Sequence, residues 1–274
     1  MRRFEGKSVV ITGASSGIGE ACARKFVAEG ARVVLAARSK EPLDRLSREL
    51  GDDVTQAVPT DISDVGQCKH LLHEAQARFG SVDVLVNNAG KNTRGHYENT
   101  PLDEILGMLE VNLRAPMVLT RLALPIMRSQ GAGSIVNVAS LAGRLPLAEE
   151  ATYSATKFAL RIFSFALAEE LRDTPVRVSV VSPGPVDTGF ITDPEVIYDV
   201  PALIFSQPMS TADEIADLIL QSAADGARER TKPMLGARLA TLSYLVPSLR
   251  RVLLPVFERK GEREKKKYID RNLR

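Results

Sequence analysis

Short apolar runs alternate with longer amphipathic stretches along residues 1–190 of this chain. The apolar runs consist almost entirely of valine, isoleucine and leucine, as in Val9–Ile11 and Val33–Leu35. Strands that are apolar throughout are typical of a parallel sheet covered on both faces, and the amphipathic stretches supply the covering helices. The pattern therefore predicts an α/β fold with a doubly wound parallel sheet and helices on both faces.

The individual elements follow one another in a regular order. We expect strands at residues 9–11, 33–35, 54–58, 82–86, 135–138, 176–181 and 232–235. We expect helices at residues 18–29, 42–50, 64–79, 102–130, 150–172 and 210–224, the last of them capped by Ser210. Residues 190–208 mix aromatic, proline and acidic residues without a clear period, and they predict a mobile segment.

The composition is that of an ordinary water-soluble globular protein. Of 274 residues, 44% are apolar and 26% are charged, and no run approaches the roughly 20 apolar residues of a membrane-spanning helix. The only cysteines, Cys22 and Cys68, argue against a disulfide framework and fit a reducing compartment, so we expect a cytoplasmic protein. The net charge of +2 hides an asymmetry, because residues 228–274 carry +9 and residues 1–227 carry −7.

A glycine-rich turn follows the first strand directly and opens the first helix. In Thr12–Gly19 the glycines have the spacing G-x-x-x-G-x-G, which allows a tight turn and a close approach of the backbone to a phosphate. The free N–H groups and the positive dipole end of the helix then favour an anion. Because of its position between a strand and a helix, the turn predicts a dinucleotide site rather than a turn without a chemical role.

The end of the second strand bears on the choice between NAD and NADP. A carboxylate there binds the ribose 2′-hydroxyl, whereas an arginine accommodates a 2′-phosphate. Here the sequence has Arg38 followed by Ser39, and no acidic residue. We therefore expect NADP(H) in preference to NAD(H).

Tyr153 and Lys157 lie four residues apart on one predicted helix, and Ser140 lies upstream of them. Residues at this spacing share a helix face, so the ammonium group can lie beside the phenol. A free tyrosine has a pKa near roughly 10, too high for acid–base chemistry at neutral pH, and a neighbouring positive charge lowers that pKa. Since the Ser140 hydroxyl can hold a substrate oxygen against the same phenol, the trio predicts a proton-transfer site.

With these motifs the chain resembles the short-chain dehydrogenase/reductases over about residues 5–190, in their compact single-domain form with a Rossmann-like sheet. The TGxxxGIG turn of that family matches Thr12–Gly19, and its YxxxK motif matches Tyr153–Lys157. Its NNAG segment, which stabilises the sheet beside the cofactor, matches Asn87–Gly90. The helix asparagine of its proton relay matches Asn112, and its substrate-orienting serine matches Ser140.

The resemblance implies a role for each catalytic residue. Tyr153 exchanges a proton with the substrate oxygen, and Ser140 stabilises the developing oxyanion. Lys157 lowers the pKa of Tyr153 and binds the nicotinamide ribose, and Asn112 connects Lys157 to solvent through a water. Asp61 contacts the adenine ring, and Val186 and Thr188 lie near the carboxamide. The cofactor-binding residues expected in all are Gly13, Ser15, Ser16, Gly17, Ile18, Gly19, Arg38, Ser39, Asp61, Ile62, Asn88, Ala89, Gly90, Tyr153, Lys157, Pro183, Gly184, Val186 and Thr188.

The expected activity is that of an NADP(H)-dependent oxidoreductase, which interconverts a carbonyl and a secondary or primary alcohol by hydride transfer. A non-catalytic NADP(H)-sensing interaction protein on the same fold is the alternative. We assign residues 1–235 to one NADP-binding and catalytic domain, with a substrate loop at about 190–208. Pocket walls are expected at about 91–97, 141–150 and 190–208.

The expected partners are a small-molecule carbonyl or alcohol and further copies of the chain, and nucleic acid is not among them. The family implies a homodimer or homotetramer that is held together by the helices at 102–130 and 150–172. His70 and His73 lie three residues apart on a predicted helix, but no further histidine or cysteine nearby completes a ligand set. We therefore expect no metal site.

Residues 236–274 form a basic, amphipathic extension of the same domain. Apolar residues recur there at three- to four-residue spacing among arginines and lysines, and Pro247 and Pro255 are expected to break the run into short helices. Two interpretations stay open: peripheral contact with an anionic membrane surface, or a helical cap over the substrate cleft or a partner subunit. Family members with similar extensions act on steroids, retinoids and lipid-like ketones, which implies a hydrophobic substrate by analogy.

Overall fold

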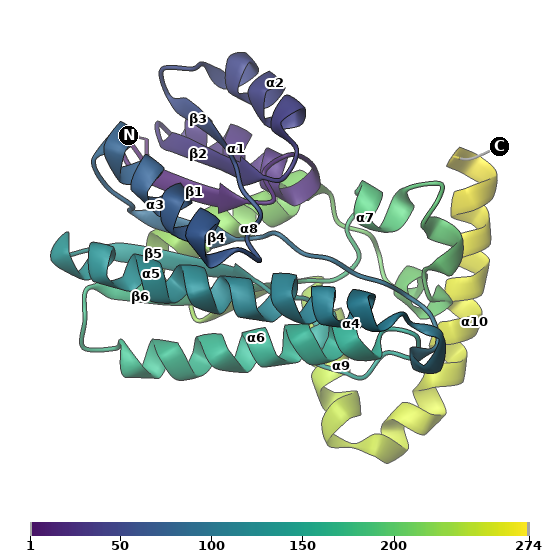
Figure 1. Ribbon diagram of the computed structural model, residues 1–274. Coiled ribbons are helices and arrows are strands. Elements are labelled where there is room, and N and C mark those ends of the chain that lie inside the picture. Colours follow the sequence, from purple (N-terminus) through teal and green to yellow (C-terminus); the bar gives the residue numbers. More distant parts are fainter. Residues whose placement is uncertain (1, 273–274) are drawn as a thin grey trace.

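A seven-stranded parallel sheet forms the centre of the structure, a computed structural model that describes residues 2–272 (Figure 1). The strand order β3-β2-β1-β4-β5-β6-β7 means that the chain winds outward in opposite directions from β1 and β4. The strands are β1 (Ser8–Thr12), β2 (Arg32–Ala37), β3 (Thr55–Pro59), β4 (Val84–Asn87), β5 (Gly133–Val138), β6 (Val176–Pro183) and β7 (Glu229–Lys232). The predicted doubly wound α/β fold, Rossmann-like and with a C-terminal helical extension, is confirmed.

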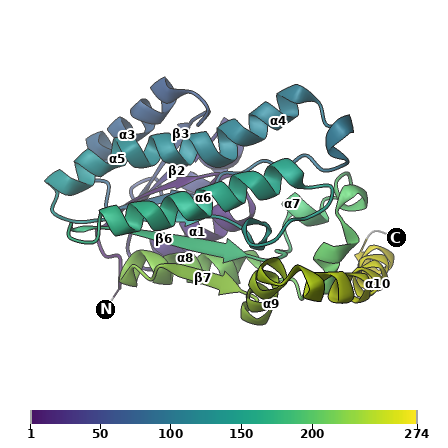
Figure 2. The ribbon, with the colours of Figure 1, turned by 90° about the horizontal axis from the view of Figure 1, so that it is seen from below.

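Helices cover both faces of this sheet (Figures 1 and 2). The helices along the sheet are α1 (Gly17–Ala28), α2 (Lys40–Leu50), α3 (Val65–Phe79), α4 (Leu102–Leu109), α5 (Ala115–Ser129), α6 (Ala151–Glu170) and α8 (Ala212–Asp225). Val9 and Ile11 belong to the core on the face of α1, α2 and α8, whereas Val10 belongs to the core on the face of α3, α5 and α6. Because neighbouring residues of a strand point to opposite faces, a strand between two helical layers has to be apolar throughout.

The carboxyl ends of the strands meet at one edge of the sheet. Thr12 of β1, Asn87 of β4 and Val138 of β5 end there, since all paired strands are parallel. The strand order reverses between β1 and β4, and open parallel sheets bind ligands in the crevice outside such a reversal. The fold therefore places the glycine turn after β1 at the expected ligand edge.

The helix expected at residues 102–130 is interrupted. A π-helical turn, η2 (Glu110–Arg114), joins α4 to α5 and contains Asn112. Such turns are rare and occur frequently at functional sites. The single long helix expected from the sequence is therefore three segments, and the irregular one carries a predicted site residue.

Two boundaries near the C-terminal end of the sheet differ from the expectation. The cap of α8 is Thr211 rather than Ser210, because Thr211 and Glu214 form a capping box in which each side chain accepts a bond from the other's backbone N–H. The last strand comprises Glu229–Lys232 rather than residues 232–235. Pro233 has no N–H with which to continue the ladder, and α9 (Met234–Leu245) starts after it.

Residues 190–208 contain short helical turns and a small core of their own. The turns are α7 (Gly189–Thr192), η4 (Ile197–Asp199) and η5 (Ala202–Ser206). Ile197 and Phe205 are buried there with Tyr268 from the C-terminal extension packed against them. Residues 190–208 show no regular period because they form three short turns. The mobility of this segment stays a prediction.

The extension folds into two helices, α9 and α10 (Pro247–Asn272), which reach from the end of the sheet to the side of α7 (Figure 1). Pro247 begins α10, where its missing N–H leaves no bond unmade. Pro255 lies inside α10 and does not end it, so the expected break at this residue is wrong. The helix continues because its later turns pack on η5, with Gly261 against the backbone of Ala202. In residues 2–272 no helix is long and apolar enough to cross a membrane.

Candidate active site

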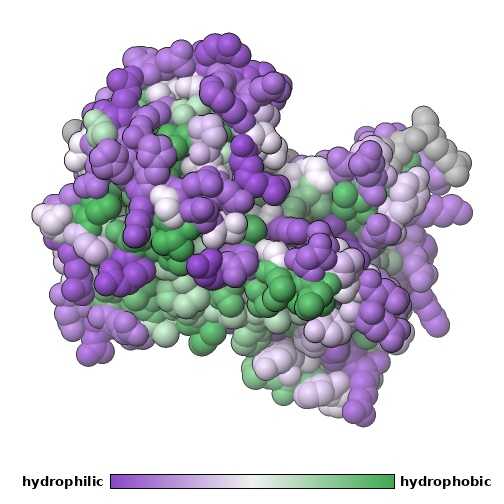
Figure 3. Space-filling model, viewed as in Figure 1, coloured by the Kyte–Doolittle hydropathy of each residue, from purple (hydrophilic) through white to green (hydrophobic). Residues whose placement is uncertain are grey.

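A cleft of about 1010 Å³ opens at the carboxyl edge of the sheet. The glycine turn, the end of β2 and the NNAG segment line one part of it, and residues from α6, α7, η5, α9 and α10 line the other. Figure 3 shows a hollow between the part of the molecule that carries α1 and α2 and the part that carries α7 and α10. Apart from Gly19 and Asn112, the predicted site residues line this cleft.

The glycine turn has the geometry of an anion cradle. Ser16 precedes α1 without a side-chain capping bond, so the first N–H groups of the helix stay available. Gly13 has a φ of 68°, and a Cβ there would lie 2.9 Å from the Cα of Ala89. A Cβ at Gly19 would lie 2.1 Å from the Gly13 carbonyl oxygen, so Gly19 is buried beneath the turn and does not reach the cleft. Both positions therefore require glycine, and they fit the close approach of a pyrophosphate.

Asn88 fixes this turn against the end of β4. Its side-chain Nδ2 donates to the carbonyl oxygens of Thr12 at 3.0 Å and Gly13 at 3.3 Å. The Thr12 hydroxyl accepts from the backbone N–H groups of Asn88 at 3.0 Å and Ala89 at 3.1 Å. These four bonds tie two strand ends together at the point where the strand order reverses.

Arg38 and Ser39 follow β2 at the same part of the cleft, and both are exposed. Within residues 2–272, Arg38 has no hydrogen bond or ion pair, whereas Lys40 pairs with Asp44. Asp61 accepts from the N–H and the hydroxyl of Ser63 at 2.9 and 2.7 Å, and these bonds lower the pKa of its carboxyl. The charge of Arg38 also lowers the pKa of Asp61, so a guanidinium and a carboxylate that attract each other without a direct ion pair line this end of the cleft.

Tyr153, Ser140 and Lys157 come together in the middle of the cleft. Tyr153 and Lys157 are on α6, and Ser140 lies just after β5. The hydroxyls of Tyr153 and Ser140 share a hydrogen bond. The Lys157 Nζ lies 5.8 Å from the centre of the Tyr153 ring and donates to the carbonyl oxygen of Val138 at 2.9 Å.

Burial is the largest cause of the pKa shifts of Tyr153 and Lys157, whose exposed fractions are 8% and 4%. Burial raises the pKa of Tyr153 and the charge of Glu150 raises it further, while the bond to Ser140 and the charge of Arg94 act in the opposite direction. Burial lowers the pKa of Lys157 to about 8. Lys157 is not among the groups that shift the pKa of Tyr153 here, and its Nζ donates to the Val138 carbonyl oxygen, so its expected lowering of that pKa stays a prediction.

Asn112 lies beside Lys157 but does not line the cleft. Its Oδ1 accepts from the Lys91 N–H at 2.8 Å, and its Nδ2 donates to the Lys91 carbonyl oxygen at 2.8 Å. A Cβ at Gly90 would lie 3.5 Å from the Asn112 Oδ1 and 3.6 Å from the Lys157 Nζ, so both groups flank this glycine. The π turn thus holds a fully buried amide next to the lysine, and its link to solvent stays a prediction.

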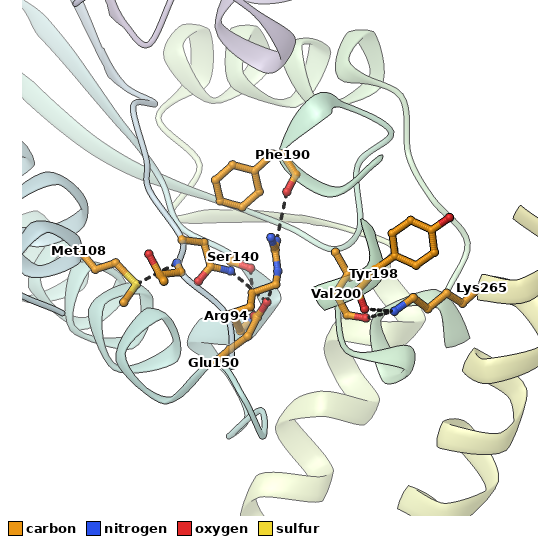
Figure 4. A network of polar contacts seen from close by, with 11 residues as sticks. Arg94, Met108, Ser140, Glu150, Phe190, Tyr198, Val200 and Lys265 are labelled. Carbon is orange, nitrogen blue, oxygen red and sulfur yellow. Dashed lines mark hydrogen bonds and ion pairs between the residues drawn. The ribbon is translucent and has the colours of Figure 1, made fainter. Parts of the chain in front are cut away.

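A charge pair that the sequence did not reveal forms the wall beside Tyr153 (Figure 4). The Arg94 Nε lies 2.9 Å from the Glu150 Oε1, and both side chains are at most 5% exposed. The Arg94 Nη2 donates to the Phe190 carbonyl oxygen at 3.1 Å, and the Phe190 ring lies between Arg94 and Tyr153, at 5.5 and 6.0 Å. One arginine therefore links the loop after β4, the start of α6 and the substrate segment.

The remaining wall of the cleft is mainly apolar but contains polar residues such as Asn92, Asp193 and Arg250. The expected segments 91–97, 141–150 and 190–208 contribute to it, as do residues of the extension that the sequence analysis did not place there. Those additional residues are Leu239, Ala240, Ser243, Arg250, Leu253, Leu254 and Phe257. Of the two interpretations of the extension, the structure therefore contains the cap over the cleft. The helical spacing of its leucines was visible in the sequence, but no signal indicated which surface they cover.

His70, His73 and Glu74 lie apart from this cleft on α3. Their possible ligand atoms are within 4.8 Å of one another, and both histidines are exposed. The Nδ1 atoms lie 3.9 and 3.6 Å from a Glu74 oxygen, which describes ordinary pairing on a solvated helix face.

Comparison with known proteins places this site in a class and then in a family. The arrangement is that of a nucleotide-dependent oxidoreductase, and the family model for the short chain dehydrogenases matches residues 7–194. The chain therefore belongs to the short-chain dehydrogenase family, whose members act on CH–OH groups.

Curated relatives are identical to this chain at more than a third of the matched residues. An uncharacterized oxidoreductase of Staphylococcus aureus (strain USA300) is 39% identical over 182 residues, which are 66% of this chain and 79% of the relative. The ketoacyl reductase HetN of Nostoc sp. (strain PCC 7120) is 40% identical over 223 residues, which are 80% of this chain and 77% of the relative.

Solved structures agree with the fold along most of the chain. A short-chain dehydrogenase/reductase from Burkholderia phymatum in complex with NAD has a TM-score of 0.82 and 27% identity, over 91% of this chain and 97% of its own. A metagenomic short-chain oxidoreductase in complex with NADP has a TM-score of 0.71 and 33% identity, over 84% and 97%. Because one neighbour holds NAD and the other NADP, the comparison supports a nicotinamide nucleotide site without a preference between the two.

Proposed function

We propose that this protein is an NADP(H)-dependent oxidoreductase that interconverts an apolar carbonyl compound and its alcohol. The observation that carries the proposal is that Tyr153, Ser140 and Lys157 share one cleft with the glycine turn. Every group needed to bind a dinucleotide and to move one proton is therefore present at one edge of the sheet.

The residues divide the proton chemistry between them. When bound, the dinucleotide supplies or accepts the hydride. Tyr153 is protonated at neutral pH, since burial raises its pKa above an ordinary value that is already roughly 10, and a protonated phenol is the form that donates to a carbonyl oxygen during reduction. Ser140 presents its hydroxyl to the same oxygen and stabilises the charge that develops there. Lys157, with a pKa of about 8, keeps a cation next to this centre at neutral pH.

The preference for NADP(H) rests on Arg38. Its guanidinium lies at the cleft without an ion pair in the described part of the chain, and the end of β2 offers no carboxylate. Arg38→Asp is expected to lower the NADPH/NADH ratio of kcat/KM by about ten- to a hundredfold, the range of one charge-assisted hydrogen bond. Arg45→Asp on α2 makes the same charge change outside the cleft and is the matched control. An unchanged ratio in Arg38→Asp would contradict the NADP preference.

The apolar character of the substrate rests on the wall opposite the glycine turn. Leu145, Leu147 and Phe190 lie close to the catalytic residues there, and leucines of the extension continue the surface. The Nostoc relative is named a ketoacyl reductase, and a ketone carried on an acyl chain has the shape and polarity that such a wall accommodates. Steroid- and retinoid-like ketones share the same two properties.

Oxidation of NADPH in the presence of a panel of such carbonyl compounds tests the activity. Tyr153→Phe is expected to lower turnover by about 10²- to 10⁴-fold with little change in NADPH affinity. Tyr198→Phe removes an exposed hydroxyl and is the control. Full turnover by Tyr153→Phe would contradict the mechanism. Binding of NADPH by the unaltered protein without turnover of any carbonyl would favour the NADP(H)-sensing alternative.

A further inference from the structure

The helical lobe formed by residues 234–257, called the tip below, exposes a group of apolar side chains. The tip projects from the body at the lower edge of Figure 1, and Figure 3 shows apolar and hydrophilic side chains next to each other on it. Single exposed apolar residues are normal, but a group of them on one lobe marks a contact site. The exposed apolar side chains of the tip are between 40% and 71% accessible, and they are Met234, Leu235, Leu242, Tyr244, Leu245, Val246, Val252 and Val256.

The charges of the tip all have one sign. No aspartate or glutamate occurs between Glu229 and Glu258, whereas Arg238, Arg250 and Arg251 lie in the same stretch. Arg238 and Arg251 are exposed, and within residues 2–272 neither has an ion pair. The tip is therefore an apolar surface that carries unneutralised positive charge.

The inner side of the same two helices is a wall of the active-site cleft. Leu239 and Ala240 of α9 and Leu253, Leu254 and Phe257 of α10 face the cleft, while Leu245 and Val252 face outward. One pair of helices thus separates the cleft from the exposed apolar surface. Whatever covers the tip lies within one helix diameter of the bound substrate, about 10 Å.

We propose that the tip docks on an anionic lipid surface, from which the apolar substrate enters the cleft between α9, α10 and the substrate segment. The proposal rests on the proposed function, because it names the source of the apolar carbonyl compound. Aliphatic side chains then enter the acyl boundary, and the arginines contact the headgroups, the arrangement of interfacial amphipathic helices. A second copy of the chain fits less well, because a two-fold contact through the tip brings arginines of both copies together without an acidic partner.

Vesicle co-sedimentation of the full chain tests the proposal. The unaltered protein is expected to sediment with phosphatidylcholine vesicles that contain phosphatidylserine, and to remain in solution with phosphatidylcholine alone. Arg238→Glu/Arg251→Glu and Leu245→Glu/Val252→Glu are each expected to lower the partition coefficient at least about tenfold, since each basic group near such a surface contributes about 1 kcal/mol. Tyr97→Glu, at 62% exposure in the turn before α4 and outside the cleft lining, is the control.

None of these four altered residues lines the cleft. Turnover of a short water-soluble ketone with NADPH should therefore be unchanged in both tip variants, whereas turnover of a ketone embedded in the anionic vesicles should fall with the partition coefficient. The docking proposal would be overturned if the tip variants sedimented with the vesicles as well as the unaltered protein does, or if the unaltered protein did not sediment. Neither outcome would contradict the proposed oxidoreductase activity. If Leu245→Glu/Val252→Glu abolished self-association and left vesicle binding unchanged, the docking proposal would be overturned, and a second copy of the chain would be the partner of the tip.

Discussion

Two opposite charges, Glu150 and Arg94, lie in the wall beside Tyr153 and act on its pKa in opposite directions. Glu150 raises this pKa and Arg94 lowers it. Burial raises the pKa of Glu150 itself, and Arg94 and Asn92 act against that shift. The proton affinity of the Tyr153 phenol therefore depends on residues outside the Tyr153–Lys157 motif itself.

Glu150→Gln is expected to move the pH profile of alcohol oxidation to lower pH. Oxidation requires the deprotonated phenol, and removal of the carboxylate charge lowers the pKa of Tyr153. The measurement is kcat/KM for an alcohol and NADP⁺ as a function of pH, with Glu149→Gln, the less buried neighbour, as the control. A profile that stays in place in Glu150→Gln would contradict the electrostatic role of the pair.

Lys157→Met is expected to make the protein inactive and, at pH 7, more stable. The pKa of Lys157 is about 8 in the folded protein against an ordinary 10.5. Between these pH values the unfolded chain binds the additional proton, so stability rises with pH there, and below pH 8 the folded state carries the full cost of the buried charge. Removing the buried charge stabilises the folded state, and losing the hydrogen bond to Val138 destabilises it. Together the two changes should raise the free energy of unfolding by about 2 kcal/mol.

Urea unfolding at pH 7 and at pH 10 measures this effect. The stability of the unaltered protein should increase between the two pH values, and that increase should be absent from Lys157→Met. Lys266→Met, on an exposed part of α10, should retain it. A lower stability of Lys157→Met at pH 7 would show that the lysine contributes more to the folded state than its burial costs.

Some site residues were predictable because their chemistry is encoded locally, whereas others, such as Asn112 and Asp61, followed only from the family resemblance. Tyr153 and Lys157 are one helical turn apart, and the glycine turn occupies eight successive positions between a strand and a helix. Arg94 and Glu150 are 56 residues apart, and neither has a local partner that would indicate a buried pair. Their meeting depends on how the loop after β4 crosses the start of α6, which no short-range pattern contains.

At the scale of elements, α10 holds the substrate segment from outside. The Lys265 Nζ donates to the carbonyl oxygens of Tyr198 and Val200 at 2.8 Å each (Figure 4). The Tyr268 hydroxyl donates to Asp187 at 3.0 Å. Gly261 allows the helix to approach η5, because a Cβ there would lie 1.9 Å from the Ala202 carbonyl oxygen. The shape of the substrate wall therefore depends on the position of this helix.

Gly261→Ala is expected to move α10 away from η5. The clash should lower the free energy of unfolding by about 1–3 kcal/mol and raise KM for an apolar ketone severalfold, with the Kd of NADPH unchanged. Thermal unfolding and steady-state kinetics measure the two effects, with the exposed neighbour Lys260→Ala as control. An unchanged KM would contradict the dependence of the wall on α10.

The regular elements were predictable because burial on both faces leaves a strong pattern. β1 and β2 contain continuous apolar runs, whereas β6 has polar residues among its valines, and all three lie where the sequence predicted strands. The last strand was misplaced because all four residues of β7 are only partly buried and include three charged side chains, so it has no such pattern. The π turn at Asn112 and the uninterrupted path of α10 through Pro255 depend on tertiary packing, to which periodicity is blind.

At the scale of the whole molecule, the helices α4 and α6 expose apolar side chains away from the tip. Leu102 and Leu106 of α4 and Ile162 of α6 are 69%, 51% and 56% exposed. This surface agrees with the predicted homodimer or homotetramer contact through these helices, which stays a prediction together with the cytoplasmic location.

Ile162→Glu is expected to dissociate that assembly, because a charge buried in an apolar interface without a partner is strongly unfavourable. Light scattering after size-exclusion chromatography should then give the mass of a single chain, whereas Leu245→Glu on the tip should keep the mass of the unaltered protein. A monomeric unaltered protein would contradict the prediction.

The order of the walls along the chain has a consequence for synthesis. Every residue of the cofactor side, from Gly13 to Thr188, leaves the ribosome before the first cleft residue of α9, Leu239. A nascent chain can thus fold the cofactor side of the cleft while the substrate side, which α9 and α10 complete, is still open to water. A stop codon just after Lys232 would leave the glycine turn and the Tyr153 centre encoded and remove the part of the cleft wall that α9 and α10 supply, so such a gene would specify a nucleotide site with its substrate side left open.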